Sequence, residues 1–226
     1  MFSPEELSAL WLSAKVAFWA TLVSLPFAIA VAWWLVRVPC RFKFLVEASL
    51  QLPMVLPPVV LGYILLIVFG SQGVIGGWLQ QWGIQLAFDW KGAVVASIVV
   101  AFPLMVQPIK LSFQMMDNQM EQAAATLGAN AWQIFSRIYL PLALPGITIG
   151  SILCFSRSLG EFGATITFVG NIPDETRTIP IAIYSLLQQP NGDHLAIRLV
   201  VLSMILAFSA LLTNHFILYR YKKQLD

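Results

Sequence analysis

Apolar residues dominate five segments of the chain, each long enough to cross a bilayer as one helix. A hydrocarbon core of about 30 Å needs roughly 20 helical residues, and an apolar run of about 18 or more is typical of a spanning helix. The pattern predicts an all-α integral membrane protein with five transmembrane helices, over Leu10 to Val36, Phe44 to Phe69, Ala93 to Leu111, Leu140 to about Leu159, and Leu195 to Tyr219.

The composition indicates that lipid, and not water, is the main solvent of this chain. Of its 226 residues, 58% are hydrophobic and 11% are charged, whereas ordinary soluble domains average about 25% charged. A soluble protein with a large core is the alternative for any apolar chain, and the length of the apolar runs argues against it. The net charge of +2 is too small to indicate a nucleic acid as partner.

Short clusters of basic residues predict how the chain is oriented. Short loops rich in Lys and Arg remain in the cytoplasm, and two clusters decide the orientation here. With five crossings, the N-terminus is then outside, the segment between the third and fourth spans is cytoplasmic, and residues 160–194 are outside. A secretory signal carries positive charge before its apolar run, whereas this chain has Glu5 and Glu6 there. We therefore expect that the N-terminal segment is not removed as a signal peptide. The clusters are Arg37, Arg41 and Lys43, and Arg220, Lys222 and Lys223.

Prolines interrupt three consecutive apolar segments. Proline at membrane depth removes a backbone hydrogen bond, which is tolerated where a neighbour or a water-filled cavity satisfies the carbonyl. Each proline taken singly is equally consistent with a kink that serves packing, but their clustering favours a translocation path. They are Pro53, Pro57 and Pro58 in the second segment, Pro103 and Pro108 in the third, and Pro141 and Pro145 at the start of the fourth.

The cytoplasmic segment from Asp117 to Pro141 has the signals of a capped helix. Asp117 and Asn118 are good N-cap residues, and Glu121 is placed three residues after Asn118 to complete a capping box. Gly128 permits either a helix end or the close approach of another backbone, and a second amphipathic stretch, residues 129–139, follows. The small residues between Gln122 and Gly128 are about equally consistent with two roles. The helix either docks on another protein or lies on the membrane surface as a connection between two spans.

The spacing in this segment resembles the signature of permease subunits of ABC importers. The signature reads Glu-Ala-Ala, three residues, Gly, nine residues, Ile, one residue, Leu-Pro. Gln122 stands where the signature has Glu, and Glu121 lies one residue earlier. The resemblance implies a coupling helix that sits in a cleft of a nucleotide-binding subunit. The remaining matches are Ala123, Ala124, Gly128, Ile138, Leu140 and Pro141.

Further stretches resemble the molybdate branch of type I ABC importer permeases, with sulfate and thiosulfate permeases as nearest relatives. They are residues 52–63, 157–168, 172–173 and 176–180. The resemblance implies a permease domain over residues 11–216, a periplasmic N-terminus over 1–10 and a cytoplasmic basic tail over 217–226. It also implies a bacterial inner membrane, a homodimer, a periplasmic molybdate-binding protein, and two cytoplasmic ATPase subunits that hold ATP and Mg²⁺.

The chain lacks the motifs of an enzyme. No Gly-x-x-x-x-Gly-Lys-Ser/Thr loop is present to cradle ATP phosphates. His194 and His215 stand singly without ligands at metal spacing, and Cys40 and Cys154 fall in segments at different depths, so neither a disulfide nor a metal site is indicated. The sequence shows no recognisable Ser/His/Asp or Cys/His set for nucleophilic catalysis. We therefore expect no catalytic residue, no metal and no cofactor in this chain, and ATP hydrolysis by a partner.

The outer end of the fourth span carries a charged pair. Arg157 and Glu161 lie four residues apart, within reach of each other on one helix. Either they form an internal ion pair, which we favour because Glu161 cancels much of the field, or Arg157 and Ser158 contact a passing oxyanion. Gly160 and Gly163 bracket Glu161, so residues 160–168 are expected to form a short helix or turn that closes the outer mouth, with Phe162 as its plug.

Other residues around this gate are weaker candidates. Thr148, Ser151 and Ser156 are candidates for lining the path, although hydroxyls in spans more often bond to their own helix. Residues 179–189 are apolar over a stretch too short to span, and we expect them at the outer surface, where the binding protein docks.

The sequence leaves the transported ion open. A sulfate, thiosulfate or tungstate permease is the alternative within the family, and an ion-coupled secondary transporter is the alternative from another class. A secondary transporter usually shows two repeated halves and an acidic relay at the midplane, and neither is visible here.

Overall fold

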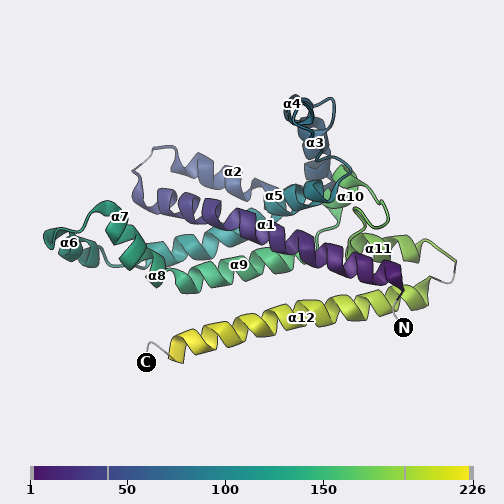
Figure 1. Ribbon diagram of the computed structural model, residues 1–226. Coiled ribbons are helices and arrows are strands. Elements are labelled where there is room, and N and C mark those ends of the chain that lie inside the picture. Colours follow the sequence, from purple (N-terminus) through teal and green to yellow (C-terminus); the bar gives the residue numbers. More distant parts are fainter. Residues whose placement is uncertain (1–2, 40, 191, 224–226) are drawn as a thin grey trace.

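The computed structural model describes residues 3–39, 41–190 and 192–223, without the side chains of residues 118, 210 and 213–223. Over these residues the chain is all-helical (Figure 1). The helices are α1 (Pro4–Arg37), α2 (Lys43–Val55), α3 (Pro58–Phe69), α4 (Val74–Gln80), α5 (Trp90–Gln114), α6 (Asn118–Thr126), α7 (Ala131–Ile134), the π-helix η1 (Phe135–Tyr139), α8 (Leu140–Leu142), α9 (Leu144–Leu159), α10 (Gly163–Val169), α11 (Ile179–Leu187) and α12 (Asp193–Lys223).

Helices α1, α5 and α9 pack against one another and form the centre of the bundle. Small residues on α1 permit this packing, because Ala17, Ala20 and Ala28 are completely buried and small side chains let helix backbones approach closely. On α9, a Cβ added at Gly150 would stand 2.6 Å from the Met105 carbonyl oxygen of α5. The close contact of α5 with α9 therefore depends on a residue without a side chain.

Proline explains where the second expected span breaks, but it does not break the third. The chain leaves α2 at Leu56 with an extended backbone (ψ 142°), as expected for a residue before proline, and α3 then turns away by 112°. The prediction that Pro103 and Pro108 interrupt the third span is wrong, since α5 runs unbroken from Trp90 to Gln114. Its packing against α1 and α9 holds the helix together where two backbone hydrogen bonds are missing.

The described residues contain two helices long and apolar enough to span a membrane, α1 and α5. The count rises to four if each bent pair is one span, namely α2 with α3, and residues 131–142 with α9, which meet at 64°. The fifth expected segment lies in α12, part of whose side chains is outside the described residues. Five spans therefore remain a prediction.

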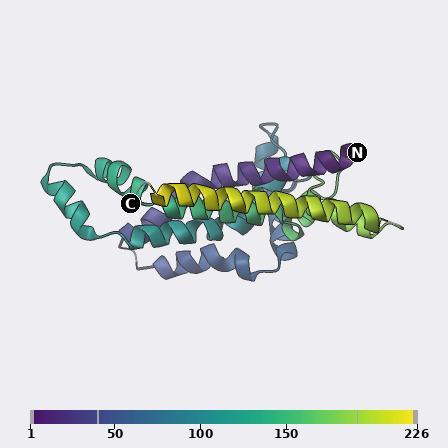
Figure 2. The ribbon, with the colours of Figure 1, turned by 90° about the horizontal axis from the view of Figure 1, so that it is seen from below.

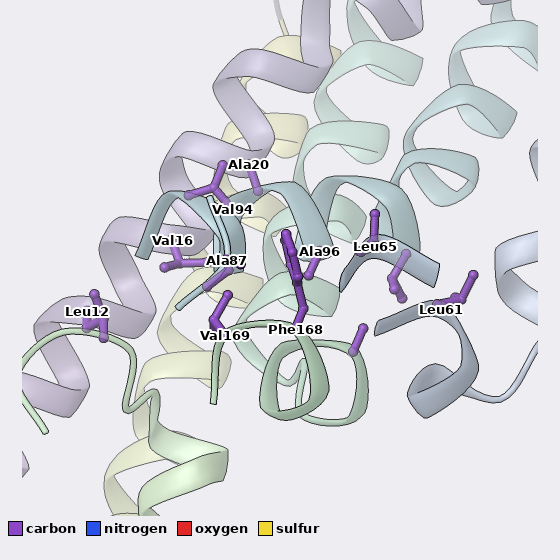
Figure 3. Packing of buried hydrophobic residues seen from close by; sticks show 13 residues of the cluster. Leu12, Val16, Ala20, Leu61, Leu65, Ala87, Val94, Ala96, Phe168 and Val169 are labelled. Atoms are coloured by element: carbon purple, nitrogen blue, oxygen red, sulfur yellow. The ribbon is translucent and has the colours of Figure 1, made fainter. Parts of the chain in front are cut away.

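Of the three clusters of buried apolar residues in the described part of the chain, the two larger ones lie toward opposite ends of the bundle. In the first, Phe168 and Val169 of α10 pack with Val16 of α1 and Val94 of α5 (Figure 3). The second includes Met105 of α5 and Tyr139 of η1. The first cluster fixes α10 to the bundle, and the second fixes the chain that follows α6.

The two ends of the bundle carry different parts of the chain. The N-terminus, α10 and α11 lie at one end, whereas α6, α7 and the C-terminal end of α12 lie at the other (Figure 1), and the view turned by 90° agrees (Figure 2). Helix α1 runs between these ends. The expected coupling segment and the expected outer gate therefore lie at opposite ends of the molecule.

Candidate functional site

Helix α6 begins one residue earlier than a capping box at Asn118 requires. Asp117 is the N-cap, and its Oδ1 accepts a hydrogen bond from the Gln119 amide at 2.9 Å. The predicted box between Asn118 and Glu121 is therefore wrong. The physical reason is that the Glu121 carboxylate binds elsewhere in the fold.

Glu121 joins α6 to two other elements. Its Oε2 lies 2.6 Å from Arg37 Nη2, in the last turn of α1, and accepts a hydrogen bond of 2.8 Å from the Tyr139 hydroxyl of η1. The guanidinium carbon of Arg37 lies 4.3 Å from the centre of the Tyr139 ring. Gln122 and Ala123, in contrast, are exposed. Glu121 thus faces this chain, while the next two residues face away from it.

Gly128 ends α6 in a left-handed conformation with φ +85°. The Gly128 amide donates to the Ala125 carbonyl and the Ala129 amide to the Ala124 carbonyl, both at 3.0 Å. These two bonds make the Schellman C-cap, for which glycine is preferred. A Cβ at Gly128 would have no atom within 4 Å. Of the two roles that the sequence leaves open, the structure shows a helix end, and among the described residues no other backbone approaches Gly128 closely.

The second amphipathic stretch is helical from residue 131 and widens before the proline. Asn130 and Gln133 form a capping box, with bonds of 2.9 and 3.0 Å. The π-helix η1 follows, in which the Leu140 amide donates to the Phe135 carbonyl. Pro141 has no amide to donate and its ring crowds the preceding turn, which accounts for the wider turn at this place. Ile138 and Leu140 pack on the second apolar cluster.

Large apolar side chains are exposed at this end of the bundle. Leu127 is 88% exposed, Trp132 is 72% exposed, and Met120 is more than half exposed. An exposed apolar surface is typical of an interaction site when its side chains are contiguous, so these residues are candidates for contact with a partner. None of these three residues was predicted from the sequence, because Leu127 and Trp132 occupy unspecified positions of the family signature and Met120 precedes it. The available signal was their place among the small and polar residues around Gly128.

At the opposite end, Arg157 and Glu161 form an ion pair, with 2.7 Å between Nη1 and Oε2. Glu161 is almost fully buried, at 2% exposed, and its Oε1 accepts a hydrogen bond of 2.9 Å from the Ala164 amide. The carboxylate thereby caps the start of α10. Ser158 is buried as well.

Residues 160–168 form the turn that follows α9 and most of the short helix α10 (Gly163–Val169). Gly160 follows the last residue of α9 and is exposed. A Cβ at Gly163 would stand 2.6 Å from the Cβ of Pro58, so α10 begins in close contact with α3. The half-buried Phe162 ring lies 5.0 Å, between ring centres, from Tyr184 of α11. The role of Phe162 as a plug stays a prediction.

Two of the three candidate hydroxyls of the path bond to their own helix. Thr148 donates to the Leu144 carbonyl and Ser151 to the Ile147 carbonyl, both at 2.8 Å. Ser156 is half-buried. Among the residues that the structure describes, no group of three His, Cys, Asp or Glu side chains could hold a metal ion.

Over residues 24–223 the chain matches the family described as binding-protein-dependent transport system inner membrane component. The chain belongs to this family.

Relatives within the family match nearly end to end. The molybdenum transport system permease protein ModB of Escherichia coli K12 is 54% identical over 218 residues, which are 96% of this chain and 95% of that protein. The ModB of Haemophilus influenzae is 51% identical over 97% of this chain and 96% of that protein. A probable sulfate transport system permease of Chlorella vulgaris is 34% identical, over 97% and 82%.

A solved structure supports the fold. A methionine ABC transporter in inward-facing conformations matches with a TM-score of 0.77 and 16% identity, covering 97% of this chain and 99% of that chain. The match agrees with the predicted type I importer permease fold. At this identity the comparison concerns the fold alone.

Proposed function

We propose that this chain is the membrane-spanning permease subunit of an ATP-driven importer that carries an oxyanion, most specifically molybdate, by alternating access. The observation that carries the proposal is the 54% identity with a molybdenum transport permease over 96% of the chain. The sulfate alternative has weaker support, from a relative at 34% identity. Membership of a binding-protein-dependent family gives no support to an ion-coupled secondary transporter.

The proposal includes the arrangement of the complete transporter. Two copies of the chain form a homodimer in the bacterial inner membrane, each with five spans, a periplasmic N-terminus and a cytoplasmic C-terminus. Two ATPase subunits bind ATP and Mg²⁺ on the cytoplasmic side, and a periplasmic molybdate-binding protein delivers the anion. The placement of α6 and the N-terminus at opposite ends supports this topology (Figure 1).

Each end of the bundle has its own role in this proposal. Helix α6, with its C-cap and the chain to Pro141, docks on the ATPase and transmits its closure. The Arg157–Glu161 pair and α10 form the outer gate, where the buried Glu161 carboxylate serves mainly to fix the end of α9 to the start of α10. The permease needs only weak contacts with the anion, since hydroxyls, backbone amides and helix N-termini can hold one without full positive charges.

Reconstitution tests the proposal. The chain, its candidate ATPase and the binding protein are placed in proteoliposomes, and uptake of molybdate, tungstate and sulfate is compared with and without ATP. We expect ATP-dependent uptake that is greatest for molybdate. Greater uptake of sulfate supports the alternative within the family, and equal uptake without ATP contradicts the importer.

A further inference from the structure

The contacts of Glu121 connect the expected coupling helix to α1 as well as to the chain that leads into α9. The ion pair with Arg37 is short, at 2.6 Å, and the hydrogen bond from Tyr139 ends on the same carboxylate oxygen. A hydrogen bond in which one or both groups are charged is shorter and stronger than a neutral one. We call Arg37, Glu121 and Tyr139 the clamp.

The clamp rests on a rigid support. Tyr139 is 1% exposed, and its ring lies 4.7 Å, between ring centres, from Trp33 of α1. Trp33 also packs edge-on against Phe113 of α5 and Phe135 of η1. Packed aromatic groups have few alternative arrangements. A displacement of α6 must therefore move the inner end of α1 with it or break the clamp.

Helix α1 leads from the clamp to the outer end of the bundle. With 34 residues and a rise of 1.5 Å per residue, it is about 50 Å long. Near its start, the Ser13 hydroxyl accepts a hydrogen bond of 2.8 Å from the buried Ile179 amide of α11. Glu6 lies 3.4 Å from Arg198 of α12, and Glu5 lies 3.6 Å from Arg177. One continuous helix thus touches α6 at one end and α11 and α12 at the other.

From these contacts we infer that Arg37 is a positioning residue that makes α6 and the inner end of α1 move as one unit. Closure of the ATPase then reaches the outer end through α1 as well as through α9. This inference rests on the proposed function and deepens it. Arg37 acts through Glu121, whereas the exposed Gln122 and Ala123 remain available to the partner.

Substitutions and a charge swap test the clamp. Arg37→Gln and Glu121→Gln are expected to lower ATP-dependent uptake about fivefold, a factor at the lower end of typical couplings between two sites. Both variants are also expected to hydrolyse more ATP for each anion transported. The double variant Arg37→Glu/Glu121→Arg is expected to recover only the part of the loss that comes from the ion pair, because the Tyr139 hydrogen bond and the stacking of Arg37 on the Tyr139 ring are not restored. Glu47→Gln is the matched control, because it removes a 2.6 Å ion pair with Lys110 that joins α2 to α5 without touching α6.

The results separate the clamp from the proposed function. If the unaltered complex shows no ATP-dependent uptake, the proposed function fails. If that complex transports and both single variants transport equally well, the clamp is refuted. It is also refuted if the swap stays inactive and the Glu121 variants no longer copurify with the ATPase, since Glu121 then contacts the partner.

A cross-link tests the common motion directly, without relying on the stability of the charge variants. Cysteines replace Arg37 and Glu121 in a chain with Cys40→Ser and Cys154→Ser, and a short cleavable bifunctional thiol reagent joins them. We expect the joined protein to transport faster than the cleaved one, because the cleaved form lacks the clamp and the reagent restores a connection between α6 and α1. Loss of transport on joining, restored by cleavage, would overturn the inference.

Discussion

Gly128 offers the sharpest test of the coupling segment, because its substitution acts on the backbone alone. At φ +85° a residue with a Cβ is strained, and a left-handed conformation costs an L-residue about 1–2 kcal/mol. Apart from its two chain neighbours, no described residue has an atom within 4 Å of the position of a Cβ, so contacts with the rest of the described fold add no steric conflict. A cost of about 1–2 kcal/mol lowers the population of this turn conformation, relative to competing conformations, roughly 5–30-fold.

The assay is ATP-dependent uptake by the reconstituted complex for a series of variants at this position. Asparagine tolerates the left-handed region, so Gly128→Asn is expected to retain most of the uptake, Gly128→Ala less, and Gly128→Val almost none, while each variant still inserts in the membrane. If the asparagine and valine variants are equally inactive, bulk at the partner surface and not backbone strain is responsible. Full uptake by the valine variant would mean that the segment does not couple.

Three further substitutions test other contacts. A charge swap of Arg157 and Glu161 is expected to restore uptake lost in either single variant if their ion pair is structural; a swap that remains inactive favours contact with the anion. Gly62→Ala places a Cβ 2.6 Å from a carbonyl oxygen of α10 and should lower the free energy of unfolding in detergent by about 1–3 kcal/mol. Gly77→Ala should leave it unchanged, because there the added Cβ stands 3.5 Å from the Ser71 carbonyl oxygen. Ser13→Ala leaves the first amide of α11 without its acceptor, at a cost of about 1–3 kcal/mol, and unchanged stability would contradict that role.

Local signals predicted the parts of the fold that depend on neighbouring residues. Proline at positions 57 and 58 breaks the second apolar segment because the preceding residue is driven out of the helical region. The short apolar stretch after Thr178 is α11, with nine residues, too few to span. Each of these features is decided within a few residues of the signal.

Other features depend on partners that are distant in sequence. Glu121 has the spacing for a local capping box, but the folded chain offers it a cation and a hydroxyl at once, and these contacts prevail. Arg37 was interpreted only as a topology signal, since nothing near it in the sequence points to α6. The unbroken α5 likewise depends on packing against α1 and α9, which compensates for its two prolines.

The candidate site was predicted unevenly for the same reason. The reach between Arg157 and Glu161 follows from helical periodicity, and the structure places them in an ion pair. The second bond of Glu161, to the Ala164 amide, depends on the turn between α9 and α10 and has no sequence signature. The exposed Leu127 and Trp132 were missed because they occupy positions that the family signature leaves unspecified.

The central claim, that this chain carries an oxyanion at the expense of ATP hydrolysed by a partner, is tested most directly by accumulation in proteoliposomes without ion gradients. Molybdate inside the vesicles is followed over time with the active ATPase partner and with a partner whose hydrolysis is disabled. The account predicts accumulation against the molybdate gradient only with the active partner. Equal accumulation with the disabled partner, or accumulation that follows an imposed ion gradient without ATP, would contradict it.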